Sequence, residues 1–349
     1  MPKATTTIAW DPDTESILFI DQTALPRRYE VVRCSSVERL AEGIRRLEIR
    51  GAPALGVAGA LGVALAALTS RKPDPDRFRS DVRKAAEVLR STRPTAVNLA
   101  WGVDRVLDRV LTAPSIEEAR ARAVAEAVAV ADEDEAVCRT LGDYGADLIP
   151  DGATVLTHCN AGALACRAWG TALGVVRSAV AAGKEVRVIA CETRPLNQGS
   201  RLTCWEMAHE GIDVTLITDS SAAYLMQTGA VDLAIVGADR ITHDAVFNKI
   251  GTYMHAVCAR HHAIPFYVAA PLSTFDLVHM AKDITIEERS RDELAWCGDR
   301  QLAPEGVRVL NLAFDATPLD LVTAIVTEAG VLRPPYREAF ASARRGDAR

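Results

Sequence analysis

The order of apolar runs after residue 149 restricts the fold of this chain more than any other feature. Short apolar runs, typical of buried strands, alternate there with longer stretches of helical periodicity. The expected strands are 153–158, 185–191, 213–218, 231–236 and 265–270, with a further one at 307–310. Strands that are separated by helices pair in parallel, because the chain crosses back over the sheet between them. The sequence therefore predicts an α/β fold with a Rossmann-like, doubly wound parallel sheet.

The N-terminal part of the chain has a different pattern. Short alternating runs predict a small antiparallel sheet that contains residues 16–20 and 29–32. Helical periodicity follows, and the expected helices are 36–47, 52–68, 76–89, 96–111 and 115–148. A chain of 349 residues is long enough for two domains. We expect a mainly helical domain with the small sheet at 1–148 and a Rossmann-like catalytic domain at 149–349.

One stretch of the helical part is long and uncharged. Residues 51–70 contain no charged side chain, and this length would span a membrane. The stretch is built largely of alanine and glycine, however, so its transfer into lipid would release little free energy. It also follows a charged amphipathic helix and has no second apolar span to pack against. We therefore expect a buried core helix and a cytoplasmic protein without a membrane partner.

Charge and cysteine usage narrow the function further. The net charge is −6, with acids and bases mixed along the chain, which argues against a nucleic-acid partner. The eight cysteines are scattered and form no CxxC pair, so we expect free thiols in a reducing compartment and no metal site. The first strand is not followed by GxGxxG, which disfavours a dinucleotide enzyme. We expect neither a cofactor nor a metal.

Reactive side chains follow the predicted strands. Ligands of open α/β sheets bind beyond the carboxyl ends of the strands, so these positions are candidates for an active site. Cys159 follows the first strand beside a turn of small residues, which distinguishes it from the other cysteines. Asp219 and Asp239 follow two later strands, and a partly buried carboxyl group at either position could carry a proton. The spacing alone does not choose between these two aspartates.

Two loops of the N-terminal part have the form of anion-binding sites. Arg50-Gly51-Ala52-Pro53 leads directly into the uncharged helix, whose first N–H groups are free to bind a phosphate. The glycine lets the backbone approach the anion closely. Arg93-Pro94-Thr95-Ala96 has the same form before the next predicted helix. Together the loops predict a small anionic substrate.

The motifs of the chain resemble those of the methylthioribose-1-phosphate isomerase family, which acts in methionine salvage. The matching stretches are Arg50-Gly51-Ala52-Pro53-Ala54-Leu55-Gly56, Arg93-Pro94-Thr95-Ala96-Val97-Asn98-Leu99, Thr157-His158-Cys159-Asn160-Ala161-Gly162-Ala163-Leu164-Ala165, Glu192-Thr193-Arg194-Pro195, Gln198-Gly199-Ser200-Arg201-Leu202-Thr203, Gly237-Ala238-Asp239-Arg240, Asn248-Lys249-Ile250-Gly251-Thr252 and Ile264-Pro265-Phe266-Tyr267-Val268-Ala269-Ala270-Pro271. They occur in the family's order over nearly the whole chain.

This resemblance implies an aldose–ketose isomerase that acts on 5-methylthioribose 1-phosphate. It implies that Asp239 donates a proton and that Cys159 stabilises the transition state or shares in proton transfer, so the choice of Asp239 over Asp219 comes from the family. The resemblance also implies a homodimer, no metal, and substrate binding by a further set of residues. These are Arg50, Gly51, Ala52, Arg93, Gln198, Asn248 and Lys249.

The chain departs from the family pattern in one loop. Residues 242–247 lack the glycine that the family usually has there, and the loop is one residue shorter. Related isomerases accept 5-deoxyribose 1-phosphate or ribose 1,5-bisphosphate, and both stay open as alternative substrates. The same fold serves regulatory subunits of a translation initiation factor, which are binding proteins. Those subunits generally lack the pair of Cys159 and Asp239, so its presence here favours an enzyme.

Overall fold

The computed structural model describes residues 5–94 and 96–345, which form two compact units. One unit contains the N-terminal residues up to Arg139 together with 162–174, and the other contains 140–161 together with the chain after 174. The chain passes between them within helix α5 (Ile116–Ala146). The division into independently folding domains at residue 148 stays a prediction. Each unit is described separately below.

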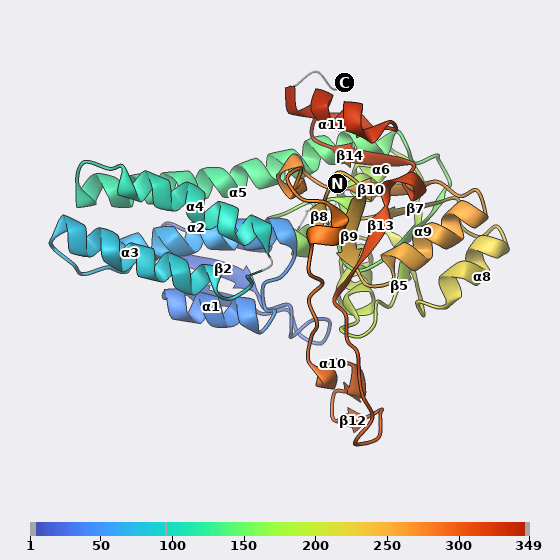
Figure 1. The fold of residues 1–349 in the computed structure, drawn as a ribbon, viewed down its shortest axis with the longest axis horizontal. Coiled ribbons are helices and arrows are strands. Elements are labelled where there is room, and N and C mark those ends of the chain that lie inside the picture. The colour runs from blue at the N-terminus through green and yellow to red at the C-terminus, as the bar shows by residue number, and fades with distance from the viewer. Residues whose placement is uncertain (1–4, 95, 346–349) are drawn as a thin grey trace. The chain divides into compact units, whose positions relative to one another are not determined.

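The N-terminal unit combines a three-stranded sheet with long helices (Figure 1). The antiparallel strands are β1 (Ile8–Asp11), β2 (Ser16–Ile20) and β3 (Val31–Cys34), and the helices are α1 (Val37–Arg45), α2 (Ala52–Thr69), α3 (Pro75–Arg90), α4 (Val97–Leu111) and most of α5. Ser36, Asp74 and Ser115 cap the first turns of α1, α3 and α5 by accepting backbone N–H groups. The sheet and the five helices of this unit confirm the predicted elements.

Helix α2 forms the centre of the N-terminal core. Its length and hydropathy would also suit a membrane span, but 78% of the apolar window is buried inside the structure. Small residues let α4 approach α2 closely, since a Cβ atom on Gly102 would lie 2.0 Å from the carbonyl oxygen of Gly56. The sheet side chains Ile8, Ile17 and Phe19 belong to the same core cluster as α2. The expected core helix is therefore confirmed.

The C-terminal unit is built on a seven-stranded sheet with the order β15-β14-β10-β7-β4-β5-β6. The strands are β4 (Thr154–Thr157), β5 (Arg187–Cys191), β6 (Asp213–Ile217), β7 (Leu233–Val236), β10 (Phe266–Ala269), β14 (Ala324–Thr327) and β15 (Gly330–Leu332). All neighbours pair in parallel except β14 and β15. From β4 the sheet grows through β5 and β6 on one side and through β7 and β10 on the other. The topological switch point, where such sheets bind ligands, therefore lies between β4 and β7.

The predicted strand at 307–310 is wrong. Residues 307–310 have no regular secondary structure, and Val307 and Leu310 are 48% and 67% exposed. The sixth parallel strand is β14, whose four residues are all buried. An apolar run of four residues does not by itself show that it is buried, and here the run belongs to an exposed loop.

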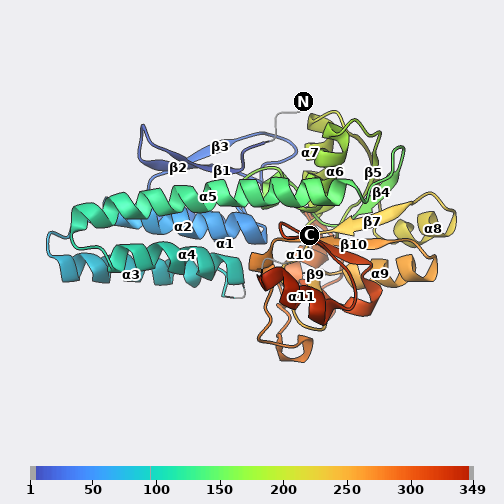
Figure 2. The same ribbon diagram turned by 90° about the horizontal axis from the view of Figure 1, so that it is seen from above.

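Helices cover the large sheet, and a second small sheet extends it. Helix α9 (Thr252–His261) packs against β7 and β10, and α8 (Ser221–Gln227) packs on α9 (Figure 2). Helix α7 (Cys204–His209) packs against β6, and α11 (Tyr336–Arg345) packs against β15. Helix α6 (Ala172–Ala181) connects β4 to β5 along the chain. The small antiparallel sheet has the order β13-β9-β8, with β8 (Arg240–Ile241), β9 (Ala245–Lys249) and β13 (Phe314–Pro318). Because β8 follows β7 after three residues, this sheet begins beside the switch point.

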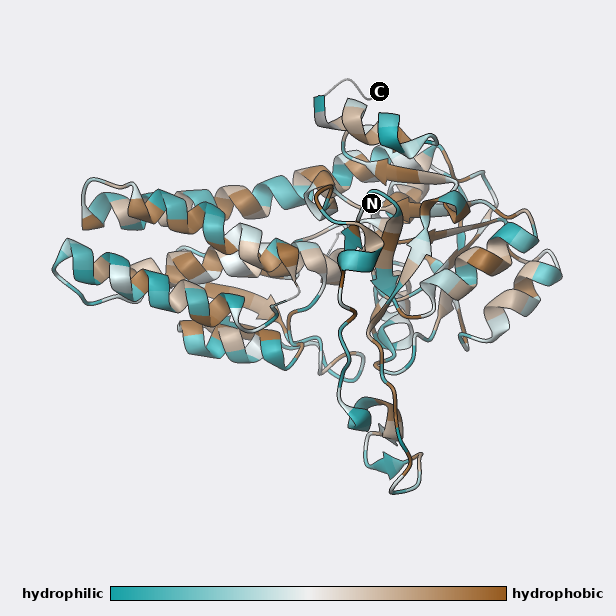
Figure 3. Ribbon diagram, in the orientation of Figure 1, coloured by the Kyte–Doolittle hydropathy of each residue, from teal (hydrophilic) through white to brown (hydrophobic). Residues whose placement is uncertain are grey.

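An arm extends from the C-terminal unit between β10 and β13. It contains α10 (Arg291–Ala295) and a hairpin of β11 (Trp296–Cys297) and β12 (Arg300–Gln301), and Figure 1 shows it reaching away from the large sheet. In Figure 3 the arm carries hydrophilic colours at α10 and β12, whereas β14 is mostly hydrophobic. The arm therefore contributes little to the core of its unit.

Candidate active site

Cys159 occupies a strained turn directly after β4. Its φ angle is 65°, in the left-handed region that side chains other than glycine rarely adopt. Both peptide groups of the residue are held by threonines, since its N–H donates to Thr193 Oγ1 at 2.8 Å and its carbonyl accepts from Thr203 Oγ1 at 2.7 Å. The side chain is half-buried. Local strain that the surrounding structure maintains is typical of functional positions.

Asp219 follows β6 and supports the Cys159 turn through the loop after β5. Its carboxylate accepts the N–H groups of Thr193 and Arg194, at 2.7 and 2.8 Å, in the loop after β5. Thr193 itself has a φ of 66° and is fully buried, so these two hydrogen bonds fix the hydroxyl that holds Cys159. Asp219 follows β6, which is the edge strand of the sheet. The geometry therefore gives Asp219 a positioning role, two strands away from the turn of Cys159.

A buried charged network supports the other side of the turn. Asn160 donates to Thr203 Oγ1 at 3.2 Å and to Glu206 Oε1 at 2.8 Å. The second oxygen of Glu206 accepts from Arg177 at 2.6 Å, and Arg177 also pairs with Glu210. The side chains of the arginine and both glutamates are at most 2% exposed. Charges buried at this depth must be paired, so the network ties the Cys159 turn to α6 and α7.

Asp239 lies at the opposite side of the switch point. It follows β7, which pairs with β4, so Asp239 and Cys159 follow the carboxyl ends of adjacent parallel strands. Its N–H donates to the carbonyl oxygen of Phe247 at 2.8 Å, which joins it to β9, and the residue is half-buried. The two candidate aspartates thus follow different strands. Asp239 follows β7 beside the switch point, whereas Asp219 follows the edge strand β6 and its carboxylate lies 3.7 Å from Nδ1 of His158.

The next residues of β9 are the predicted Asn248 and Lys249. Asn248 is buried and donates to Thr252 Oγ1 at 3.0 Å. Lys249 is 7% exposed, its ammonium group donates to the carbonyl of Ala313 at 2.8 Å, and it lies 4.9 Å from the centre of the Phe314 ring. Among the residues that the structure describes, no carboxylate lies within ion-pair distance of Lys249. A buried cation in this state can be neutralised by an anionic ligand.

Asp315 is a site residue that the sequence reasoning missed. It pairs with Asn248 across β13 and β9, and its carboxylate accepts the N–H groups of Gly251 and Tyr253 at the start of α9. Burial raises the pKa of Asp315 to about 6, although both N–H groups and Lys249 act in the opposite direction. No motif identified it beforehand, because it lies 66 positions after Lys249 and follows a loop rather than a recognisable strand.

Gln198 lies where the helix after β5 begins. It precedes a short π-helical segment, Gly199–Thr203, and this irregular helix is what places Thr203 against Cys159. The side chain of Gln198 is 7% exposed, and its Oε1 atom has no hydrogen-bond partner among the described residues. A buried amide oxygen without a partner is costly and is usually satisfied by a ligand or by water.

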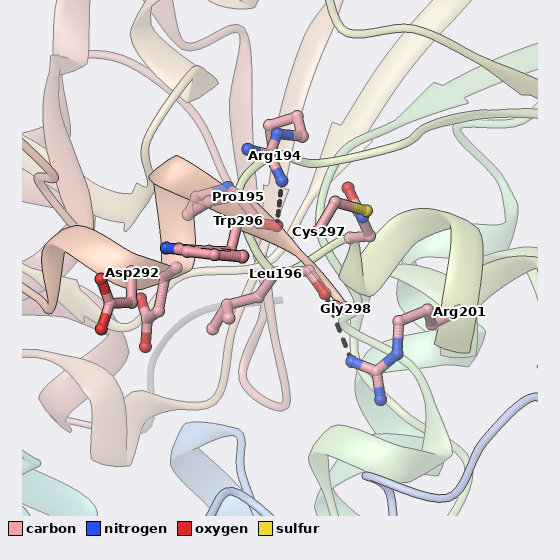
Figure 4. Close-up of a pocket in the computed structure, with 10 residues that line it drawn as sticks. Arg194, Pro195, Leu196, Arg201, Asp292, Trp296, Cys297 and Gly298 are labelled. Carbon is pink, nitrogen blue, oxygen red and sulfur yellow. Dashed lines mark hydrogen bonds between the residues drawn. The ribbon is translucent and has the colours of Figure 1, made fainter. Parts of the chain in front are cut away.

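A pocket of about 590 Å³ lies nearby, between the loop after β5 and the arm. Figure 4 shows Arg194 and Pro195 of the loop facing Trp296 and Asp292 of the arm. The guanidinium groups are used within the protein, since Arg194 donates to the carbonyls of Pro195 and Leu294 and Arg201 donates to that of Leu196. The pocket contains none of the site residues predicted from the sequence, all of which are described.

The remaining predicted residues belong to the N-terminal unit. Arg50 is 9% exposed and donates to Gln22 Oε1 at 2.9 Å, and Gln22 in turn donates to the carbonyl of Leu164. Gly51 has a φ of 96°, and a Cβ atom there would lie 2.5 Å from the backbone of Ala165, so only glycine fits. Ala52 begins α2. The Arg50 loop thus has the predicted form, with an arginine and a glycine at the start of a helix.

Arg93 precedes α4 in the same unit. It is half-buried, and its carbonyl accepts the N–H of Ala96, the residue that precedes the helix. Thr95 of the same motif lies outside the described residues. In the C-terminal unit, Cys159 and Asp239 follow the two strands that flank the switch point, and Asn248 and Lys249 lie on β9, which pairs with the strand directly after Asp239. In the N-terminal unit, both predicted arginine loops lie at helix starts.

Comparison with known proteins identifies relatives over the whole chain. A methylthioribose-1-phosphate isomerase from Heliobacterium modesticaldum is 54% identical over 95% of this chain and 97% of its own. A 5-deoxyribose 1-phosphate isomerase from Moorella thermoacetica is 50% identical over 95% of both chains.

Solved structures share the fold. The 5-methylthioribose 1-phosphate isomerase of Pyrococcus horikoshii has a TM-score of 0.92 and 42% identity, and it covers 99% of this chain and 97% of its own. A crystal structure described as translation initiation factor eIF-2B, subunit delta, from A. fulgidus has a TM-score of 0.89 and 57% identity, with 97% and 99% covered. A sequence model of the initiation factor 2 subunit family matches residues 48–334. The chain therefore belongs to the initiation factor 2 subunit family, and within it to the branch of the methylthioribose-1-phosphate isomerases.

Proposed function

We propose that this protein is an aldose–ketose isomerase that converts 5-methylthioribose 1-phosphate into 5-methylthioribulose 1-phosphate in methionine salvage. The observation that carries the proposal is Lys249, a buried ammonium group beside the switch point without a carboxylate partner among the described residues. A phosphate monoester supplies the missing negative charge. The names of the relatives from Heliobacterium modesticaldum and Pyrococcus horikoshii give the same activity to similar chains.

The reaction needs a proton donor and a group that assists hydrogen transfer. The 1-phosphate blocks the anomeric oxygen, so the sugar ring opens only when the ring oxygen is protonated. A hydrogen then moves from C2 to C1, and the C2 hydroxyl loses its proton as it becomes the ketone carbonyl. This proton balances the one added to the ring oxygen, so the ketose has the same atoms as the aldose. We assign the proton donation to Asp239 and the assistance of hydrogen transfer to Cys159, because they follow adjacent strands at the switch point.

The other predicted residues bind the substrate in this proposal. Lys249 and Asn248 hold the phosphate from β9, and the unpartnered Oε1 of Gln198 accepts a hydroxyl group of the sugar. We assign Arg50, Gly51, Ala52 and Arg93 to substrate binding as well, since both loops offer an arginine and helix N–H groups to an anion. None of these steps uses a cofactor or a metal.

Two other sugars are alternative substrates. The Moorella thermoacetica relative is named as a 5-deoxyribose 1-phosphate isomerase, and its identity to this chain is nearly as high as that of the Heliobacterium modesticaldum relative. Ribose 1,5-bisphosphate is the third candidate. A methylthio group and a methyl group differ by little apolar surface, so we expect a preference on the order of 10–200-fold between the first two sugars.

The substrate assignment is tested by measuring kcat/KM for the three sugars side by side. We expect the highest value for 5-methylthioribose 1-phosphate, a detectable value for the deoxy sugar and hardly any turnover of the bisphosphate. A preference for the deoxy sugar would change the pathway and leave the chemistry intact. Tight binding without turnover of any of them would instead favour a binding protein that resembles the regulatory subunits; the A. fulgidus structure carries the name of a translation initiation factor subunit.

We further propose that the protein acts in the cytoplasm as a homodimer. All eight cysteines are free thiols, which suits a reducing compartment. The dimer follows from the resemblance to the isomerase family. Light scattering coupled to gel filtration tests it, with an expected mass of about twice the 37.5 kDa of one chain. A monomer at micromolar concentration would contradict this assignment.

A further inference from the structure

Four side chains of different types meet behind the Cys159 turn. His158 follows β4, Cys191 ends β5, Asp219 follows β6, and His255 lies on α9. One ligand atom from each of them lies within 4.8 Å of all the others. The Nδ1 atom of His158 is 3.2 Å from Nε2 of His255 and 3.7 Å from Oδ1 of Asp219. All four belong to the C-terminal unit.

The backbone orients the first histidine towards this cluster. Nε2 of His158 lies 2.8 Å from the carbonyl oxygen of Ile250, which can only accept, so this nitrogen carries the proton. The lone pair of the ring is therefore on Nδ1, which faces His255 and Asp219. A histidine whose second nitrogen donates to a backbone carbonyl is the usual arrangement of a metal ligand.

The two histidines of the cluster are in the neutral state that a cation requires, whereas burial raises the pKa of the Cys191 thiol, which must lose its proton on binding. Both histidines are 1% exposed, and burial lowers the pKa of His158 to about 4 and that of His255 to about 3. The imidazoles are therefore neutral at physiological pH, and neutral imidazole is the form that binds metals. Cys191 is fully buried and the side chain of Asp219 is 22% exposed, so one edge of the cluster is open to solvent.

The two shortest known separations are close to those around a tetrahedral ion. Zinc bonds of about 2.0–2.3 Å at tetrahedral angles place neighbouring ligand atoms roughly 3.3–3.6 Å apart. The separations of 3.2 Å between the two histidines and 3.7 Å between His158 and Asp219 lie just outside this interval, one on each side, and the remaining pairs lie within 4.8 Å. A hydrogen bond between the histidines accounts for the shorter separation alone. This hydrogen bond does not explain why the thiol of Cys191 and the carboxylate of Asp219 lie beside the two histidines.

We propose that His158, Cys191, Asp219 and His255 bind one zinc ion. Two imidazoles, a thiolate and a carboxylate are the ligands that zinc prefers in proteins. On binding, the thiol of Cys191 releases its proton to solvent, and the proton of His255 moves from Nε2 to Nδ1, so one proton leaves per ion. Affinity therefore rises with pH. No electron is transferred, and the ion takes no part in the chemical steps of the proposed isomerase reaction.

The ion has a structural consequence for the unit. Asp219 also accepts the N–H groups of Thr193 and Arg194, and Thr193 holds the turn of Cys159. A zinc ion on this carboxylate joins β4, β5, β6 and α9 at one point. Because the ion binds the folded chain and not the unfolded chain, it raises the melting temperature.

Zinc content tests the proposal with a matched pair of variants. The full chain is depleted with a chelator, loaded with zinc, passed through a desalting column and analysed by mass spectrometry of the metal. His255→Leu removes a ligand, whereas His261→Leu changes an exposed histidine of the same helix. We expect wild type and His261→Leu to hold about one zinc ion more per chain than His255→Leu, and to gain thermal stability on loading. Equal contents in all three proteins would mean adventitious ions only and would overturn the site.

Cobalt provides a second test that does not depend on the stability of His255→Leu. A thiolate bound to cobalt absorbs in the near ultraviolet, so Co²⁺ added to the chain reports Cys191 directly. We expect this band in wild type and in Cys258→Ser, whose thiol lies on α9 outside the cluster, and not in Cys191→Ser. A band of unchanged intensity in Cys191→Ser assigns the cobalt to another thiol and contradicts the proposal.

Discussion

Lys249 carries a buried positive charge that forms no ion pair within residues 5–94 and 96–345, although the carboxyl group of Asp315 interacts with it electrostatically. Burying an unpaired ammonium group destabilises the folded protein, so we expect function to maintain it. Lys249→Met keeps the volume and removes the charge. The variant should raise KM for the sugar phosphate at least about tenfold and should melt no lower than wild type.

Lys184→Met is the control for this variant. Lys184 also donates to backbone carbonyls, those of Ala146 and Ile149, but it lies before β5, at the amino end of the sheet. Its KM should equal that of wild type. An unchanged KM in Lys249→Met would remove the lysine from phosphate binding.

The two residues at the switch point should act on the transition state. Cys159→Ala and Asp239→Asn should each lower kcat by at least about a hundredfold, with little change in KM and an intact fold. Asp219→Asn weakens the support of Thr193 and leaves both reactive groups in place, so it should mainly lower the melting temperature. Steady-state kinetics and thermal melts measure all three, and near-normal kcat excludes a residue from the mechanism.

At the scale of elements, α6 and α7 hold the Cys159 turn through the buried charged network. Glu206→Gln weakens the link between Asn160 and Arg177, whereas Glu210→Gln changes a glutamate that pairs with Arg177 alone. Each variant should cost about 1–3 kcal/mol of stability. Only Glu206→Gln should also lower kcat at constant KM, because it alone touches Asn160. Equal kcat values in the two variants would show that the network is merely structural.

Asp315 on β13 accepts N–H groups at the start of α9, and its raised pKa predicts that stability depends on pH. Burial raises the pKa of Asp315 to about 6 in the folded protein, against 3.8 as its ordinary value. Between these two pH values the unfolded chain has lost the proton and the folded chain has kept it. The free energy of unfolding therefore falls as pH rises from about 4 to about 6, by roughly 1–3 kcal/mol.

Asp315→Asn removes this titration. When denaturant unfolding is measured at several pH values between about 4 and 7, the free energy of unfolding should fall less with rising pH in the variant than in wild type. A slope that is the same in both proteins would show that Asp315 titrates normally in the folded state.

At the scale of the whole molecule, periodicity predicts the elements better than it predicts their partners. The five helices before residue 149 and the strands β4, β5, β6, β7 and β10 lie where the apolar pattern placed them. The run at 307–310 failed because four apolar residues in a loop look like a buried strand. The antiparallel β15 and the small sheet of β8, β9 and β13 carry no signal that separates them from loops.

The same limit applies to the candidate site. Residues that follow strands, such as Cys159 and Asp239, could be found because a parallel sheet brings strand ends together. The spacing did not choose between Asp219 and Asp239, and the choice of Asp239 came from the resemblance to the isomerase family and stays a prediction. Asp315 and His255 were missed because their partners lie 64 and 97 positions away along the chain. The four residues that we propose as zinc ligands are scattered along the chain, so a search for CxxC pairs does not find them.

The most direct test of the proposed function is to follow 5-methylthioribose 1-phosphate by phosphorus NMR during incubation with the purified protein. Conversion to the ketose 1-phosphate by wild type is the expected result. A protein that carries both Cys159→Ala and Asp239→Asn should leave the aldose unchanged over the same time. If wild type leaves it unchanged too, while the folded protein still binds it, the chain is not the isomerase proposed here.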